Sequence, residues 1–137
     1  MELTLPMVPD IEIAAARAAG NLARELGMSS EKIDEMAHAI IEACINAREH
    51  SCCLDQRIYL RFVGSADTGE GPRIEVWITD HGKGFDPVKA HRSGSAGAPQ
   101  KRGWGLAIMK AHMDEVEISS GPAGTTIRMV KSEKSRT

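Results

Sequence analysis

The stretch IDEMAHAIIEACINA, Ile33–Ala47, says most about the fold of this 137-residue chain. Its apolar residues recur at helical spacing and form one stripe. At about 100° per residue, Glu42 and Asn46 lie roughly opposite that stripe and one turn apart. A Glu/Asn pair alone is usually a solvated helix face, so its meaning depends on the rest of the chain. The stripe consists of Ile33, Met36, Ala37, Ile40, Ile41, Cys44 and Ile45.

Other regular elements are predicted on both sides of this helix. Ser29 or Ser30 caps its N-terminus. Upstream, an alanine-rich pattern predicts another helix, with Asp10 as its N-cap and Gly27 after its last residue. Alternating apolar residues predict the strands. The predicted elements are a strand at Met1–Leu5, a helix at Ile11–Leu26, strands at Gln56–Val63 and Arg73–Thr79, a helix at Leu106–Met113, strands at Val116–Ser119 and Thr125–Val130, and a loose tail at Lys131–Thr137.

This order of elements predicts a single α+β domain over residues 1–137. We expect the helices on one face of a mostly antiparallel sheet, which gives a two-layer sandwich. Residues 85–102 contain several glycines and prolines and show little apolar periodicity. An irregular stretch of this length inside a small domain is usually functional.

The composition is that of an ordinary soluble domain, with 42% hydrophobic and 26% charged residues. Seventeen basic and 19 acidic residues give a formal net charge of −2. Charge therefore gives no reason to expect a nucleic acid or an anionic membrane as partner. The aromatic residues, two Trp, one Tyr and two Phe, are too few for a platform on which bases stack.

The three cysteines, Cys44, Cys52 and Cys53, are an odd number and match no zinc spacing. Cys44 falls in the apolar stripe, so we expect it to be a small buried residue. The N-terminus lacks the basic start and apolar core of a signal peptide, and no apolar run is long enough to span a membrane. We therefore expect a cytoplasmic protein without direct contact to a membrane or a nucleic acid.

Three glycine-containing motifs suggest binding chemistry. Asp80–Gly84 (DHGKG) ends a predicted strand, where a buried aspartate can accept a hydrogen bond from the exocyclic amine of adenine and glycines allow close approach to a flat ring. Lys101–Leu106 (KRGWGL) places two cations and two glycines just before a helix, whose N-terminal amides suit a polyphosphate. Gly124–Thr126 lies in the last hairpin. Each motif alone is most often a turn or a helix cap.

The Glu42/Asn46 pair adds chemistry to these motifs. A carboxylate can take a proton from an attacking hydroxyl group. An amide oxygen is a hard ligand for Mg²⁺, which otherwise keeps water and substrate phosphates. The sequence has no P-loop and none of the usual protein-kinase signatures, so a nucleotide site here would be of another kind.

Taken in order, the four motifs resemble the GHKL ATPase superfamily, which includes the ATPase domains of histidine kinases. The pattern is most similar to that of the small anti-sigma-factor serine kinases of bacteria. That similarity lies in Gly103–Met109, in the M-D-x-V segment within His112–Val116, and in Gly124–Ile127. It extends over about residues 9–130, nearly the whole chain.

The resemblance implies the GHKL (Bergerat) ATP-binding fold, with ATP or ADP and Mg²⁺ as ligands. Glu42 would be the general base, Asn46 the Mg²⁺ ligand and Asp80 the residue that reads adenine, with residues 85–102 as the ATP lid. The other residues implied to bind nucleotide are Gly82 and Gly84 at the base, Arg102, Gly103, Gly105 and Leu106 at the phosphates, and Thr125 or Thr126 on the adenine side.

The resemblance also implies a function. The chain would be an ATP-dependent serine/threonine kinase and anti-sigma factor that phosphorylates a STAS-type antagonist, binds an alternative sigma factor in turn, and forms a homodimer. Two alternatives stay open: a non-catalytic, nucleotide-gated anti-sigma or adaptor module, and a kinase acting on the STAS scaffold of a sensor complex. The presence of Glu42 favours an enzyme slightly, because a pure binding module needs no base.

Overall fold

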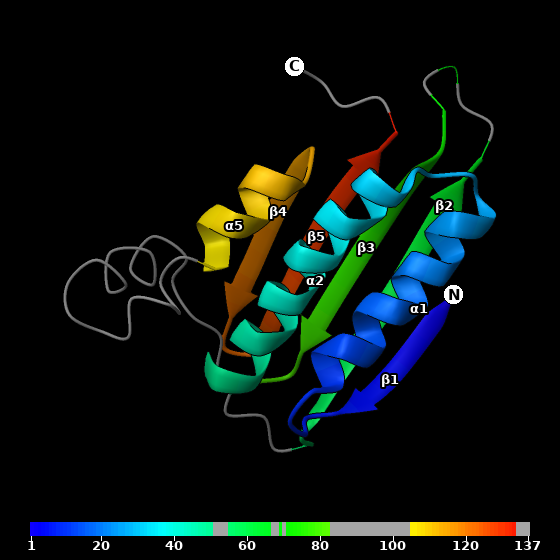
Figure 1. The fold of residues 1–137 in the computed structure, drawn as a ribbon. Coiled ribbons are helices and arrows are strands. Elements are labelled where there is room, and N and C mark those ends of the chain that lie inside the picture. The colour runs from blue at the N-terminus through cyan, green and yellow to red at the C-terminus, as the bar shows by residue number, and fades with distance from the viewer. Residues whose placement is uncertain (51–54, 67–68, 70, 83–104, 134–137) are drawn as a thin grey trace.

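The computed structural model describes residues 1–50, 55–66, 69, 71–82 and 105–133. Along these residues the helices and strands follow the predicted order, with the labels of Figure 1. None of the described helices is long and apolar enough to cross a membrane. The elements are β1 Glu2–Pro6, α1 Ile11–Glu25, α2 Ser30–His50, β2 Arg57–Ser65, β3 Arg73–Asp80, α5 Gly105–His112, β4 Glu115–Gly121 and β5 Gly124–Ser132.

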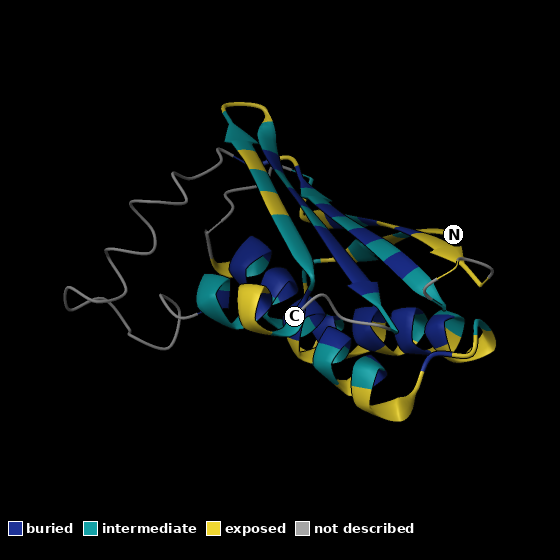
Figure 2. Ribbon diagram, turned by 90° about the horizontal axis from the view of Figure 1, so that it is seen from above, coloured by how far each residue is buried: buried dark blue, intermediate teal, exposed yellow. Residues whose placement is uncertain are grey.

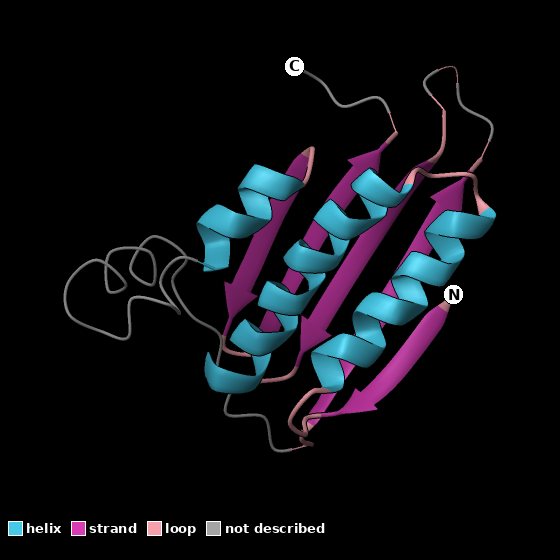
Figure 3. Cartoon of the chain, viewed as in Figure 1, coloured by secondary structure: helices cyan, strands magenta, loops and turns pink. Residues whose placement is uncertain are grey.

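The described strands form one five-stranded sheet in the order β1-β2-β3-β5-β4. Each neighbouring pair of strands is antiparallel, and the last hairpin places β5 beside β3 (Figure 3). In the register of β3 and β5, Asp80 lies opposite Thr125 and Thr79 lies opposite Thr126. Two motifs that are far apart in the sequence therefore meet where β3 ends.

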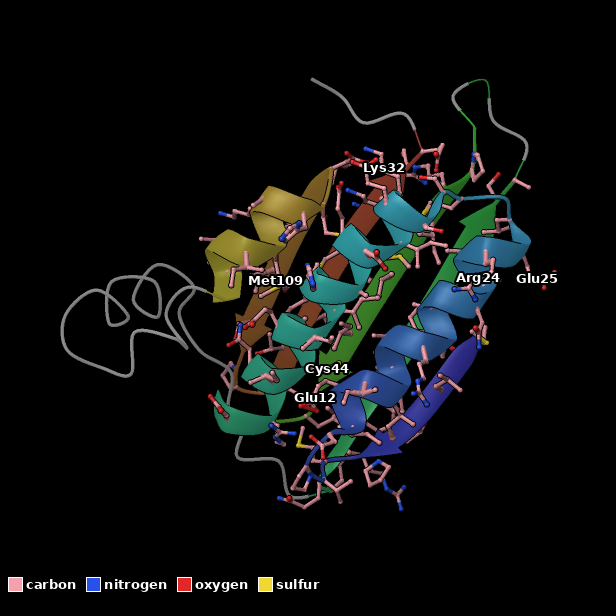
Figure 4. The ribbon with its side chains drawn as sticks, in the orientation of Figure 1. Glu12, Arg24, Glu25, Lys32, Cys44 and Met109 are labelled. Carbon is pink, nitrogen blue, oxygen red and sulfur yellow. The ribbon has the colours of Figure 1, made fainter. Side chains whose placement is uncertain are left out.

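The helices α1, α2 and α5 lie together on one face of the sheet, and the other face carries none of the described helices (Figure 2). The core includes the buried side chains of Phe62 and Ile78 from the sheet and Met36 and Met109 from the helices. Side chains fill the space between the two layers, and Met109 is labelled among them in Figure 4. The predicted α+β sandwich is confirmed.

The ends of the first two helices largely follow local sequence. Gly27 has a φ of 93°, and its N–H donates to the carbonyl of Arg24 at 3.0 Å, a typical glycine stop. Ser29 Oγ accepts a hydrogen bond from the N–H of Lys32 at 3.4 Å. Of the two serines considered, Ser29 therefore caps α2.

The start of α1 differs from the prediction. Asp10 is the N-cap residue, but it has a φ of 69° and its side chain makes no capping hydrogen bond. This end is instead held from α2, since Arg48 Nη1 donates to Glu12 Oε2 at 3.1 Å and to the carbonyl of Val8 at 3.4 Å. A tertiary ion pair thus takes the place of the local cap.

Cys44 is 1% exposed and forms no disulfide, as expected for a small core residue. Burial raises the pKa of its thiol to about 12, so the thiolate that reacts with electrophiles is not formed near neutral pH. Cys52 and Cys53 lie outside the described residues.

Asn46 does not lie on a solvated face of α2, because α5 packs along this part of the helix and leaves Asn46 only 6% exposed. One expectation, at the end of the last strand, is corrected by the packing. The last strand ends at Ser132 rather than Val130, and Lys131 is buried in it, so the tail is not loose at this point. Residues 134–137 of the predicted tail lie outside the described residues.

Candidate functional site

Glu42 and Asn46 project from α2 toward the first residue of α5, Gly105. A Cβ atom added to Gly105 would lie 2.9 Å from Asn46 Nδ2 and 3.2 Å from Glu42 Oε2. A larger residue at this position would push both side chains aside. The structure therefore brings three of the predicted site residues together where α2 meets the N-terminus of α5.

Asn46 has the surroundings expected of a cation ligand. Among the described residues, its buried Oδ1 has no hydrogen-bond partner, and Glu42 Oε2 beside it is also buried. A buried polar atom that is left unsatisfied costs about 1–3 kcal/mol. Mg²⁺ takes oxygen ligands, and it commonly uses one or two from the protein together with water and phosphate oxygens. The residues present therefore fit a magnesium ion.

Asp80, the last residue of β3, is 4% exposed. Its Oδ1 accepts a hydrogen bond from the N–H of Gly82 at 2.9 Å, which closes a tight turn directly after the strand. Gly124 packs against the backbone of Asp80, since an added Cβ would lie 2.1 Å from the Asp80 carbonyl oxygen. With a φ of 137°, this position also favours glycine. The N–H of Gly82 therefore orients the Asp80 carboxylate, and Gly124 leaves room for the Asp80 backbone.

The structure separates the two threonines that the sequence left as alternatives. Thr125 is 3% exposed and lies opposite Asp80, on the side of the sheet that the helices cover. Thr126 points to the opposite side, where its hydroxyl lies 3.1 Å from that of Thr79. Only Thr125 lies on the same side as Asp80.

These groups gather at one end of the molecule. The C-terminal half of α2, the end of β3 and the start of β5 lie toward the lower end of Figure 1. The start of α5 meets this half of α2, where Gly105 lies against Glu42 and Asn46. In that turn, Leu106 packs against the hydrophobic core. The predicted residues Gly84, Arg102 and Gly103 and the proposed lid at 85–102 lie outside the described residues, so their roles stay predictions.

A polar cluster supports the chain beyond Asp80. Asp55 Oδ2 accepts a hydrogen bond from the Tyr59 hydroxyl at 2.7 Å and lies 3.2 Å from His81 Nδ1. The Tyr59 hydroxyl holds the pKa of the Asp55 carboxyl below its usual range. The rings of Tyr59 and His81 are 4.5 Å apart between centroids. These contacts tie the residue after Asp80 to β2.

The sequence does not predict one neighbour of Thr125, or the contact of Gly124 with Asp80. The Ser120 hydroxyl, on β4, lies 2.7 Å from that of Thr125. Gly124 was noted as part of a motif but not as a residue that packs against Asp80. Its place in a two-residue hairpin turn was the available signal. No local signal marks Ser120, because it is brought there by strand pairing.

Proteins of similar sequence are named as serine-protein kinases and anti-sigma factors. The serine-protein kinase RsbW of Bacillus subtilis is 26% identical over 140 positions, which cover 96% of this chain and 84% of that protein. The protein named anti-sigma F factor of Thermoanaerobacter pseudethanolicus is 26% identical over 135 positions, which cover 96% of this chain and 92% of that protein.

Solved structures support the fold. The RsbU and RsbW domains of Rv1364c from Mycobacterium tuberculosis match with a TM-score of 0.69 at 23% identity, over 99% of this chain and 33% of that longer chain. The histidine kinase domain of the Erythrobacter litoralis EL346 blue-light activated histidine kinase matches with a TM-score of 0.52 at 16% identity, over 93% of this chain and 65% of that chain. The family model described as the histidine kinase-like ATPase domain matches residues 8–131, and the chain belongs to that family.

Proposed function

We propose that the protein is an ATP-dependent serine/threonine kinase and anti-sigma factor, which phosphorylates a STAS-type antagonist. The observation that carries this proposal is the close packing of Asn46 and the buried Oε2 of Glu42 against Gly105, the first residue of α5. The family and the relatives named as serine-protein kinases and anti-sigma factors point the same way.

The proposed roles follow from the chemistry of each group. Phosphoryl transfer requires chiefly positioning and charge stabilisation. Glu42 would accept the proton of the attacking serine or threonine hydroxyl, at the buried Oε2 that faces α5. Backbone amides at the start of α5 would bind phosphate oxygens, because the N-terminus of a helix carries unpaired N–H donors.

Asp80 and Asn46 would hold the two ends of the nucleotide. The Asp80 carboxylate would accept a hydrogen bond from the adenine amine, with Thr125 beside it. Asn46 Oδ1 would be a ligand of Mg²⁺, which when bound neutralises charge on the phosphates. We also propose that Arg102 and Gly103 bind the phosphates and that residues 85–102 form the ATP lid.

The partners are proposed on the same basis. The protein would bind either an alternative sigma factor or the unphosphorylated STAS-type antagonist, and nucleotide state would select between them. It would be a cytoplasmic homodimer. Sedimentation with and without nucleotide measures the dimer directly, and a strict monomer in both conditions would contradict it.

The decisive test of the kinase is Glu42→Gln, with Glu49→Gln, an exposed position on the same helix, as the matched control. The variants are incubated with Mg-ATP and candidate STAS-domain proteins, and phosphoprotein is measured beside nucleotide affinity. Glu42→Gln should reduce transfer by about 10² to 10⁴ and leave binding almost unchanged, while Glu49→Gln should do neither. Undiminished transfer would remove Glu42 from the role of base. Nucleotide binding by the wild type without any phosphoprotein would favour the non-catalytic module.

A further inference from the structure

Lys131, near the end of β5, is 2% exposed. It follows Thr125, Ile127 and Met129 in the row of alternate β5 residues that face the helices, all of them buried. A buried ammonium group costs much free energy unless it is paired. Lys131 therefore requires partners within the helix layer.

Both partners come from helices that build the candidate site. Lys131 Nζ donates to Glu35 Oε2 on α2 at 2.5 Å, and it also donates to the backbone carbonyl of His112, the last residue of α5. The hydrogen bond from Lys131 holds the pKa of the Glu35 carboxyl below its usual range, so Glu35 stays a carboxylate near neutral pH. A single ammonium group thus joins β5, α2 and the C-terminus of α5.

The turn after α5 is fastened to the same strand. The N–H of Asp114 donates to the carbonyl of Val130 at 2.9 Å, and the N–H of Ser132 donates to Asp114 Oδ2 at 2.7 Å. The rings of His38 and His112 meet edge to face, 5.2 Å apart between centroids. Together these contacts restrain the C-terminal end of α5 from sliding along α2.

The opposite end of α5 forms the candidate site. From Gly105 to His112 the helix rises about 10 Å at 1.5 Å per residue. On α2, Glu35 and Glu42 are seven residues apart, which places them on one face about 10 Å from each other. The two helices thus run side by side, joined through Lys131 at one end and by Gly105 against Glu42 and Asn46 at the other (Figure 1).

We propose that Lys131 is a positioning residue for the nucleotide site. By fixing the C-terminal end of α5 to α2 and β5, it sets how closely Gly105 approaches Glu42 and Asn46. This proposal rests on the proposed function only for the identity of the ligand, since the position of α5 is measurable without nucleotide. Lys131 acts through α5 and is not assigned a contact with ATP.

The test uses Lys131→Met, which keeps the apolar stem and removes the ammonium. Lys110→Met makes the same chemical change on the exposed side of α5. Ile74→Val, opposite Lys131 in the sheet register, controls for a loss of stability in the core. NMR signals of the Gly105 amide and the Asn46 side-chain amide are compared without nucleotide, and the Kd for Mg-ADP is then measured at a temperature where all variants are folded.

We expect Lys131→Met to shift both NMR signals and to raise the Kd about tenfold, with both controls within about twofold of the wild type. Unchanged signals in folded Lys131→Met, or equal shifts in Ile74→Val, would overturn the proposal. If Lys131→Met does not fold, Glu35→Gln takes its place and must move the same two signals, or the positioning role is lost. If the signals move but the wild type binds no ADP, the positioning contact is upheld and the proposed function fails.

Discussion

Replacing Gly105 by alanine should weaken nucleotide binding about tenfold while leaving the protein folded. The added Cβ would lie 2.9 Å from Asn46 Nδ2, whereas ordinary contact begins at 3.4 Å, so the amide must retreat by about 0.5 Å. A misplacement of 1 Å in a site can cost on the order of a hundredfold, and half of that corresponds to roughly tenfold, or about 1.4 kcal/mol.

Gly105→Ala should lower the free energy of unfolding by no more than about 2 kcal/mol, because two effects oppose each other. Alanine in place of glycine favours a helix by up to about 1 kcal/mol, whereas overpacking costs about 1–3 kcal/mol. The assay is calorimetric titration with Mg-ADP, paired with thermal unfolding of the same sample. Gly121→Ala is the matched control, because a Cβ there meets no atom within 4 Å. Wild-type affinity of Gly105→Ala for Mg-ADP, or an equal loss of affinity in Gly121→Ala, would show that contact at Gly105 does not control binding.

Two further predictions concern stability. Gly124→Ala should lower the urea midpoint by an amount that corresponds to more than about 2 kcal/mol. The added Cβ would lie 2.1 Å from the carbonyl oxygen of Asp80, and the φ of 137° at this residue disfavours alanine. An unchanged midpoint would contradict the contact. Hydrogen bonds from Arg128 hold the pKa of Glu75 below its usual range, so the pair stabilises the fold at neutral pH, and this contribution disappears as the pH falls through the lowered pKa. Glu75→Gln should therefore be less stable near pH 7 and lose less stability below about pH 5 than the wild type, whereas parallel pH profiles would show that the pair contributes nothing.

The helices and strands can be predicted from the sequence because their signals are periodic and involve residues close together in the chain. The stripe of Ile33–Ala47 predicts α2, and alternation predicts the hairpin of β2 and β3, and both are confirmed. Gly27 marks the end of α1 for a conformational reason that holds in any context. Asp10 shows the limit, since the tertiary pair of Glu12 and Arg48 replaces the local cap.

The site was predicted less completely, because its residues meet through packing and strand register. The pair of Glu42 and Asn46 could be identified as a motif, but nothing local shows that α5 covers it. The choice between Thr125 and Thr126 depends on which side of β5 faces the helices. The sequence predicts that the last strand ends at Val130 and that Lys131 begins a loose tail, whereas its pairing with α2 and α5 makes Lys131 part of the core.

The most direct test of a nucleotide site in this chain is calorimetric titration of Mg-ADP and Mg-ATP into the wild type and Asp80→Asn, with Asp34→Asn, exposed on α2, as control. Asp80 lies buried beside Thr125, and a hydrogen bond to a charged group contributes about 1.5–3 kcal/mol. We expect the wild type and Asp34→Asn to bind both nucleotides, and Asp80→Asn to bind at least about tenfold more weakly. Absence of binding to the folded wild type at about millimolar nucleotide, or equal affinity in Asp80→Asn, would contradict the assignment.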